Sequence, residues 1–178
     1  MRMLLSGSFL LLIATTVVHA QSKVPVVEAH VLIATDAAHA NSSVKLAVIA
    51  QVAAGYHVNA HKPTLDYLIP TELKMEPSEQ FVVKSVVYPA GMPKKFEFSD
   101  APLSVYQGSV VVGAVLHTAR DLAPGTYTVK GKLAYQACSD HACLPPTSVP
   151  LAVAIRIVAP NIPLKPVESD VFQRIKFE

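Results

Sequence analysis

Residues 126–135 read Thr-Tyr-Thr-Val-Lys-Gly-Lys-Leu-Ala-Tyr, a segment in which apolar and polar side chains alternate. A period of two places successive side chains on opposite faces of a β-strand. The segment therefore predicts a strand with one face in a core and one in water, after a turn at Pro124-Gly125. The positions expected to face the core are Tyr127, Val129, Leu133 and Tyr135, and those expected to face water are Thr126, Thr128, Lys130 and Lys132.

Residues 149–157 alternate in the same way, with their odd-numbered positions expected to point inward. Four further segments are rich in β-branched residues and bounded by Pro, Gly, Asn or Asp, which is typical of strands. These segments are residues 26–33, 44–52, 81–88 and 109–116. Six or more short strands without long helical patterns predict an all-β fold, an antiparallel β-sandwich.

The amino-terminal end has the pattern of a secretory signal peptide. Arg2 precedes an apolar stretch, and the small residue Ala20 precedes Gln21. A membrane anchor is the alternative, but the apolar core of about ten residues is short of the ~20 that a spanning helix needs. We expect cleavage after Ala20, export, one domain over residues 21–159, and a proline-containing tail over residues 160–178 that leaves the domain as an extended strap.

Charge and motifs exclude several classes of function. The chain has 15 Lys and Arg against 13 Asp and Glu, so losing Arg2 with the signal peptide leaves 14 against 13, a net charge of +1. The sequence has no basic patch with interleaved aromatic residues, so we do not expect nucleic acid as a partner. Neither a Gly-rich phosphate loop nor a Gly-x-Ser-x-Gly motif is present. We therefore expect no cofactor and no hydrolytic or phosphoryl-transfer chemistry.

The two cysteines, Cys138 and Cys143, lie between the two best strand segments. If those strands form a hairpin, a disulfide between the cysteines is geometrically reasonable. By chain-entropy bookkeeping, so short a loop contributes only about 2 kcal/mol of stability. His141 between them would favour a thiolate if protonated, whereas Asp140 would oppose it. The spacing alone leaves a structural disulfide and a redox-active pair about equally plausible.

Two other classes of protein remain open at this point. One is a secreted, non-catalytic binding module whose hairpin disulfide is structural, because sandwich folds host many functions. The other is a metal carrier, because Cys138, His141 and Cys143 are soft ligands within six residues. Their spacing matches no structural-zinc pattern, so we expect no metal. His57 and His61 are four residues apart, but a strand-like context argues against a helical metal pair, and an exposed loop is the expected place for His61.

Three blocks of sequence together resemble the amino-terminal periplasmic domain of the thiol:disulfide interchange protein DsbD. The first runs from Tyr-Gln-Ala-Cys at 135–138 to Cys-Leu-Pro-Pro at 143–146, followed by Val-Pro-Leu at 149–151. The second is Gly-Tyr-His-Val-Asn-Ala-His-Lys-Pro at 55–63, with Tyr-Leu-Ile-Pro-Thr at 67–71. The third is Phe-Glu-Phe-Ser-Asp at 96–100, with Val-Tyr-Gln-Gly at 105–108.

This resemblance implies an immunoglobulin-like sandwich that carries a redox-active pair, Cys138 and Cys143. It implies a periplasmic protein-disulfide reductase component that works by thiol–disulfide exchange. The implied donor is a thioredoxin-like domain or a membrane electron-transfer protein, and the implied acceptor is a periplasmic disulfide isomerase or a cytochrome-maturation thioredoxin. Because the chain carries neither a transmembrane electron-transfer segment nor a thioredoxin domain, we expect a free-standing module whose donor is another polypeptide.

The resemblance also implies roles for individual residues around the pair. Cys143 is expected to be the sulfur that a partner attacks, and Cys138 the resolving cysteine. A loop bearing an aromatic cap shields the pair in the family, and Phe98, or else Phe96, is the expected cap. Side chains expected to line the same side are Tyr56, His57, Asn59 and His141.

Overall fold

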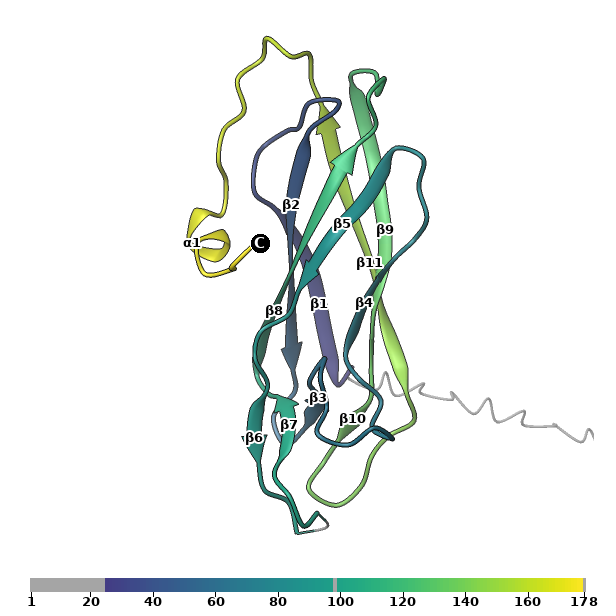
Figure 1. Ribbon diagram of the computed structural model, residues 1–178, viewed down its shortest axis with the longest axis vertical. Coiled ribbons are helices and arrows are strands. Elements are labelled where there is room, and N and C mark those ends of the chain that lie inside the picture. Colours follow the sequence, from purple (N-terminus) through teal and green to yellow (C-terminus); the bar gives the residue numbers. More distant parts are fainter. Residues whose placement is uncertain (1–24, 98, 178) are drawn as a thin grey trace, which may run out of the picture.

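The computed structural model describes residues 25–97 and 99–177. Its fold is all-β, an immunoglobulin-like antiparallel sandwich (Figure 1), as the sequence predicts. The signal-peptide prediction concerns residues 1–20, which lie outside the described residues. The strands are β1 (Val27–Ile33), β2 (Ser43–Val52), β3 (His57–Asn59), β4 (Glu72–Met75), β5 (Phe81–Val87), β6 (Met92–Lys94), β7 (Leu103–Tyr106), β8 (Ser109–Thr118), β9 (Gly125–Tyr135), β10 (Ala137–Cys138) and β11 (Thr147–Ile157), followed by the short helix α1 (Ser169–Phe172).

The hairpin of β9 and β11 confirms the alternation read from the sequence. The two strands pair along their whole length, from Tyr135 opposite Thr147 to Gly125 opposite Ile157. Val129, Leu133 and Tyr135 are buried, and the threonines and lysines between them are exposed. The four other predicted segments are also strands, with ends that differ by one or two residues.

The main core lies between two sheets, one of strand order β1-β2-β8-β5 and one of order β11-β9-β4. The inward positions of β2 and β8 are almost all aliphatic, and Leu46, Val112 and Leu116 are at most 1% exposed. From the facing sheet, Leu133 and Ile155 are at most 2% exposed. Burial of such side chains is the principal favourable term in folding.

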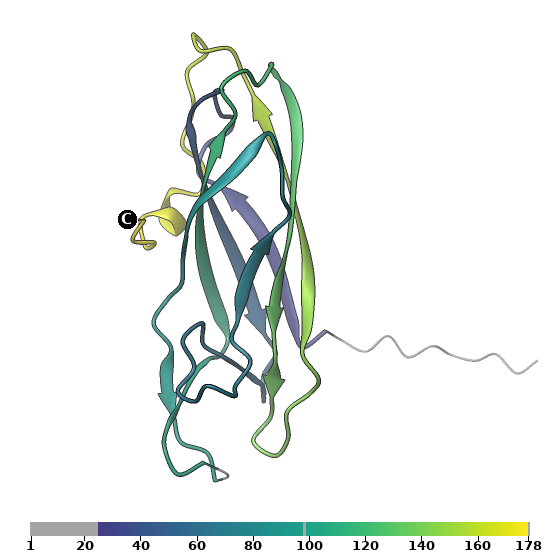
Figure 2. The ribbon, with the colours of Figure 1, turned by 45° about the vertical axis from the view of Figure 1, so that its right-hand side comes forward.

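A small sheet of strand order β10-β3-β7-β6 forms one end of the sandwich (Figure 2). Its strands are two to four residues long, too short to show a period in the sequence. Gly55, with φ +81°, occupies the left-handed region that favours glycine, in the turn that leads into β3. This sheet holds the segment that carries the cysteines.

The C-terminal segment returns along the outer face of the β1-β2-β8-β5 sheet (Figure 1). Pro166 forms a bridge with Thr35, and the backbone N–H of Asp36 donates to the Lys165 carbonyl at 3.0 Å. Farther along, Ile175 and Phe177 lie directly over Gly113. The strap thus lies against the body of the domain, a placement that the sequence does not decide.

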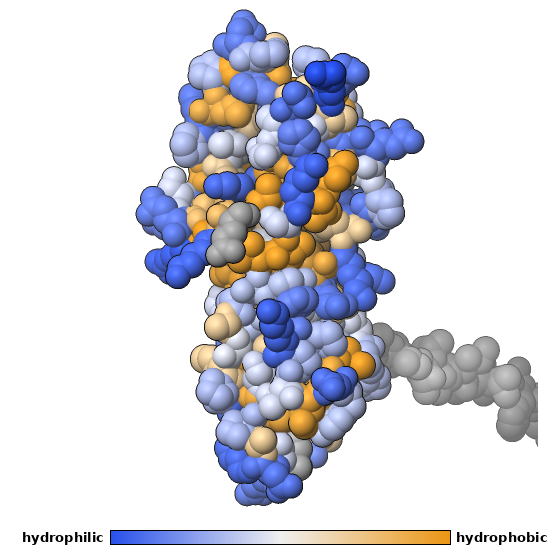
Figure 3. Space-filling view, viewed as in Figure 1, coloured by the Kyte–Doolittle hydropathy of each residue, from blue (hydrophilic) through white to orange (hydrophobic). Residues whose placement is uncertain are grey.

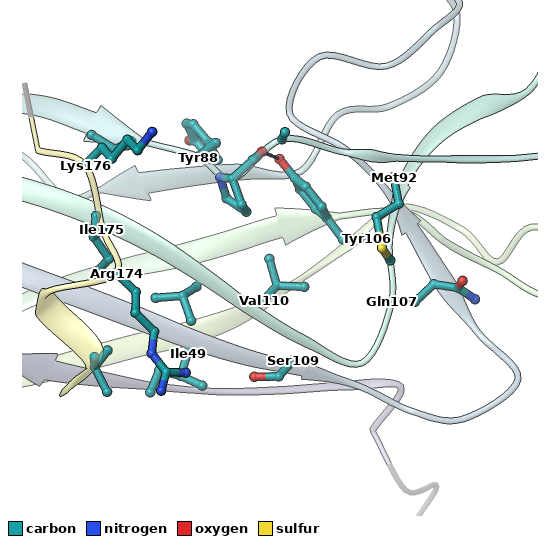
Figure 4. A pocket seen from close by; sticks show the side chains of 15 residues that line it. Ile49, Tyr88, Met92, Tyr106, Gln107, Ser109, Val110, Arg174, Ile175 and Lys176 are labelled. Atoms are coloured by element: carbon teal, nitrogen blue, oxygen red, sulfur yellow. Dashed lines mark hydrogen bonds between the residues drawn. The ribbon is translucent and has the colours of Figure 1, made fainter.

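A pocket of about 740 Å³ lies beside this contact, between the C-terminal segment and the strands around it (Figure 4). Apolar side chains line most of it, among them Ile49, Val110 and Ile175, and Arg174 and Lys176 lie at its edge. Apolar residues also gather at mid-height on the face shown in Figure 3. Within residues 25–97 and 99–177, no helix is long and apolar enough to cross a membrane.

Candidate functional site

The cysteines occupy a tight loop between β9 and β11. The side-chain oxygen of Ser139 accepts hydrogen bonds from the backbone N–H of His141 at 3.2 Å and of Ala142 at 3.1 Å. The N–H of Ser139 donates to the Ala142 carbonyl at 2.9 Å, and the N–H of Leu144 donates to the Ala137 carbonyl at 2.8 Å. A serine that satisfies nearby backbone N–H groups favours such a turn. The turn brings Cys143 back opposite Cys138.

A disulfide joins Cys138 to Cys143, whose Cα atoms are 3.9 Å apart. The two cysteines differ sharply in exposure, because Cys138 is 2% exposed and Cys143 belongs to the exposed residues. An incoming thiolate must reach a sulfur to attack it, and access limits the rate of exchange. The arrangement therefore offers one sulfur to a partner and keeps the other inside.

His57, Cys138 and Cys143 form a row across three neighbouring backbone segments. Cys138 is opposite His57 in the antiparallel pair of β10 and β3, and on its other side it forms a bridge with Cys143. Residues directly opposite in such a pair share a face and have Cβ atoms about 5 Å apart. The neighbouring pair, Val58 and Ala137, belongs to the main core. The row therefore faces away from the main core.

The imidazole of His57 is buried beneath Phe96. His57 is 1% exposed, and its ring stacks on that of Phe96 with centroids 4.3 Å apart. Its Nδ1 atom is buried without a hydrogen-bond partner. Burial lowers the pKa of His57 below its ordinary value of 6.5, the positive charge of Lys94 lowers it further, and Asp140 acts in the opposite direction. The ring is therefore neutral at neutral pH.

Lys94, at the end of β6, connects the phenylalanine to the cysteine loop. Its ammonium group lies 5.0 Å from the centroid of Phe96, a cation–π contact, and 3.3 Å from Oδ1 of Asp140. Phe96 is 4% exposed and also belongs to a second small core with Leu103 and Val105. Of the two expected caps, Phe96 thus lies over His57, and Phe98 is outside the described residues.

The other residues predicted to line the site lie in different places. Asn59 is buried, and its side-chain amide donates to the Ile69 carbonyl at 2.9 Å, which anchors the loop after β3. Tyr56 is half-buried against the main core. His141 is exposed in the cysteine loop.

The expectation for His61 is right about the loop and wrong about its exposure. Its ring is half-buried and stacks on Tyr88 with centroids 3.7 Å apart, while Nδ1 lies 3.2 Å from the Thr71 carbonyl oxygen. The sheet pairing places Tyr88, at the end of β5, beside this loop, and no local pattern reveals that neighbour. Among the described residues, no group of three or more His, Cys, Asp or Glu side chains is placed to hold a metal ion.

Lys94 is the site residue that sequence reasoning missed. It lies 44 residues before Cys138, in a three-residue strand that contains Pro93. Neither periodicity nor spacing marks such a strand, since proline is unusual inside sheets. Only the pairing of β6 with β7 brings it to the cysteine loop.

Solved structures that match part of this chain include the N-terminal domains of two other proteins. The DsbD N-terminal domain of Neisseria meningitidis in its reduced form is 22% identical, with a TM-score of 0.41, over 70% of this chain and 86% of that one. The N-terminal periplasmic domain of ScsB from Proteus mirabilis is 19% identical, with a TM-score of 0.48, over 70% of this chain and 45% of that one. No curated protein sequence matches the chain.

The decisive comparison is with a family of sequences. The family described as "Thiol:disulfide interchange protein DsbD, N-terminal" matches residues 24–153, well over half of the chain. The matched region contains the disulfide and every strand except the last four residues of β11. The chain therefore belongs to the family of DsbD N-terminal domains.

Proposed function

We propose that this chain is a periplasmic thiol–disulfide interchange module that passes electrons between partner proteins through Cys138 and Cys143. The observation that carries the proposal is the disulfide between one exposed and one buried cysteine, within a segment that matches the family. Strained or exposed disulfides are typically the labile or catalytic ones, whereas stable structural bridges resist reduction.

In the reducing direction, the thiolate of Cys143 attacks one sulfur of a partner disulfide and releases the partner's other sulfur as a thiolate. Cys138 then attacks the Cys143 sulfur in this mixed disulfide, so the Cys138–Cys143 bond forms and the partner leaves as a dithiol. Two electrons and two protons reach the partner in total. A donor dithiol restores the reduced pair by attacking Cys143 first, because Cys143 is the exposed cysteine of the two.

The proposed donor is a thioredoxin-like domain or a membrane electron-transfer protein. The proposed acceptor is a disulfide isomerase or a cytochrome-maturation thioredoxin of the periplasm. A complex between DsbD and PilB N-terminal domains from Neisseria meningitidis is among the solved structures of similar fold, 20% identical with a TM-score of 0.39, over 68% of this chain and 80% of that one. Export would be checked by finding the chain, without residues 1–20, in the periplasmic fraction.

The reduction potential of the pair tests the proposal. Thiol trapping across glutathione and dithiothreitol buffers should give a value between roughly −180 and −270 mV, the range of exchange proteins. A value below about −300 mV would identify a structural bridge and leave a binding module as the better description.

Single-cysteine variants test the order of attack. Cys138→Ser should form a mixed disulfide with a thioredoxin-like partner through Cys143, detectable by mass spectrometry. Cys143→Ser should form far less, because Cys138 is buried. Equal trapping by both variants would contradict the assigned roles.

A further inference from the structure

The unpaired Nδ1 atom of His57 is unusual, because buried polar atoms in folded proteins are almost always hydrogen-bonded. The neutral imidazole has one donor nitrogen and one acceptor nitrogen, so Nδ1 needs a partner in either tautomer. A disulfide sulfur has no proton to donate and is a weak acceptor. The oxidised protein therefore leaves this atom unsatisfied.

Reduction would create a partner next to it. Cys138 is the cross-strand neighbour of His57, on the same face of the small sheet, with Cβ atoms about 5 Å apart by the geometry of such pairs. A Cys138 thiol can donate a hydrogen bond to Nδ1, and a Cys138 thiolate can accept one from Nδ1–H. Both groups are shielded from water, since His57 is 1% and Cys138 2% exposed.

We propose that His57 is the hydrogen-bond and proton-transfer partner of the Cys138 sulfur in the reduced protein. The proposal rests on the exchange function above and assigns the resolving half of that reaction. When Cys143 is in a mixed disulfide, the Cys138 S–H proton moves to the imidazole as the sulfur attacks Cys143. The S–S bond to the partner breaks, its sulfur leaves as a thiolate, and the imidazolium returns its proton to solvent or to that thiolate.

The surroundings of His57 suit this role. Phe96 stacks on the ring and fixes its plane, which restricts the directions that Nδ1 can face. The charged groups acting on the ring are Lys94, from β6, and Asp140, from the cysteine loop. Burial and Lys94 hold the ring neutral at neutral pH, and a neutral imidazole can take a proton that an imidazolium cannot.

The reaction of the reduced full chain with Ellman's reagent tests the proposal. The first thionitrobenzoate released reports the attack by Cys143, and the second reports the attack by Cys138 on the resulting mixed disulfide. His57→Phe keeps an aromatic ring against Phe96 but has no nitrogen. We expect it to slow the second phase about a hundredfold or more, the range of general acid–base effects, to move its pH profile upward, and to leave the first phase unchanged.

Two further variants separate proton transfer from packing. His57→Asn places an amide near the position of Nδ1, so it should recover part of the second-phase rate without the wild-type pH profile. His30→Asn removes an exposed imidazole on β1 and should leave both phases unchanged. An unchanged rate and pH profile of the second phase in His57→Phe would overturn the proposal.

Nuclear magnetic resonance of the wild-type protein gives a readout that needs no variant to fold. The ring nitrogen shifts and the pKa of His57 should differ between the oxidised and reduced forms, and identical values in both would also overturn the proposal. A protein without the exchange function gives a different result, because its wild-type cysteine pair then has a reduction potential below about −300 mV.

Discussion

At the scale of single residues, Lys94 and Asp140 shift the pKa of His57 in opposite directions. The ammonium group of Lys94 lies 3.3 Å from Oδ1 of Asp140, and the two side chains are 34% and 66% exposed. An exposed pair of this kind contributes about 0–1 kcal/mol to stability, because water screens it. Its main consequence is therefore expected at the imidazole and not in the free energy of unfolding.

We predict that Lys94→Met raises the pKa of His57 and that Asp140→Asn lowers it further. The first change removes a positive charge that lowers this pKa, and the second removes a negative charge that raises it. Both values should remain below 6.5, because burial is the largest cause of the shift. Titration of the His57 ring by nuclear magnetic resonance checks this. Each variant should change the free energy of unfolding by less than about 1 kcal/mol. A shift of the same sign in both variants would contradict the electrostatic account.

The cysteine pair could be predicted from the sequence because its partners are local and lie between two strands with clear alternation. The resemblance alone implied that His57 lines the site, and nothing in the sequence predicted its burial or its unpaired Nδ1. Lys94 and the stacking of His61 on Tyr88 depend on segments far apart in the chain. Side-chain neighbours across a sheet follow from its register, and short strands leave that register unmarked in the sequence.

At the scale of elements, the long strands were predictable and the short ones were not. The hairpin of β9 and β11 spans eleven residues per strand, so its alternation is visible over several periods. The strands of the small sheet have two to four residues and include Pro93. They exist because neighbouring strands and the small core of Phe96, Leu103 and Val105 hold them.

The C-terminal segment packs closely against β8 at Gly113. A Cβ atom at this position would lie 2.7 Å from Cγ2 of Ile175 and 2.9 Å from Cε1 of Phe177. We predict that Gly113→Ala destabilises the protein by about 1–3 kcal/mol, because these contacts are too close to accept a methyl group without displacement. Urea unfolding measures the change.

A double-mutant cycle identifies the cause of that loss. In a background of Ile175→Ala and Phe177→Ala, the same Gly113→Ala change should cost much less, since the obstructing side chains are gone. An equal cost in both backgrounds would place the effect in the strand itself, not in its contact with the C-terminal segment.

At the scale of the whole molecule, the sandwich separates two kinds of surface. The cysteine loop lies at the end formed by the small sheet, whereas the chain leaves β11 at the opposite end and runs back outside the β1-β2-β8-β5 sheet (Figures 1 and 2). A partner protein can thus approach Cys143 at the end of the molecule while the C-terminal segment lies along its side. The fold as a whole was predictable, because six long strands define both main sheets.

Three buried or half-buried tyrosines make the stability of the protein depend on pH in alkaline solution. Burial raises the pKa of Tyr88, Tyr106 and Tyr135 above the ordinary value of 10.0. Above pH 10.0, the unfolded chain therefore loses these phenol protons before the folded one, and the folded state binds more protons. The contribution of these tyrosines to stability is complete below pH 10.0. It is lost as the pH rises through their pKa values in the folded protein.

We predict that the free energy of unfolding falls as the pH rises above 10.0, as measured by urea unfolding at a series of pH values. Tyr135→Phe should make that decline less steep, because one titrating group is gone. Tyr67→Phe is the matched control, since Tyr67 is 78% exposed and its loss should leave the slope unchanged. A free energy that stays constant up to pH 11 would contradict the prediction.

The contact of Ile175 and Phe177 with Gly113 has a consequence for how the protein is made. A ribosome releases the chain from its amino end, so β2 and β8 are both complete once residue 118 has emerged. Their outer face stays uncovered until residues 163–177, which begin 45 residues farther along the chain, have also been synthesised. During that interval the nascent protein presents a bare apolar surface around Ile49 and Val111. A chaperone that binds exposed apolar surfaces would hold the chain until residues 163–177 arrive, and their packing against the sheet would displace it.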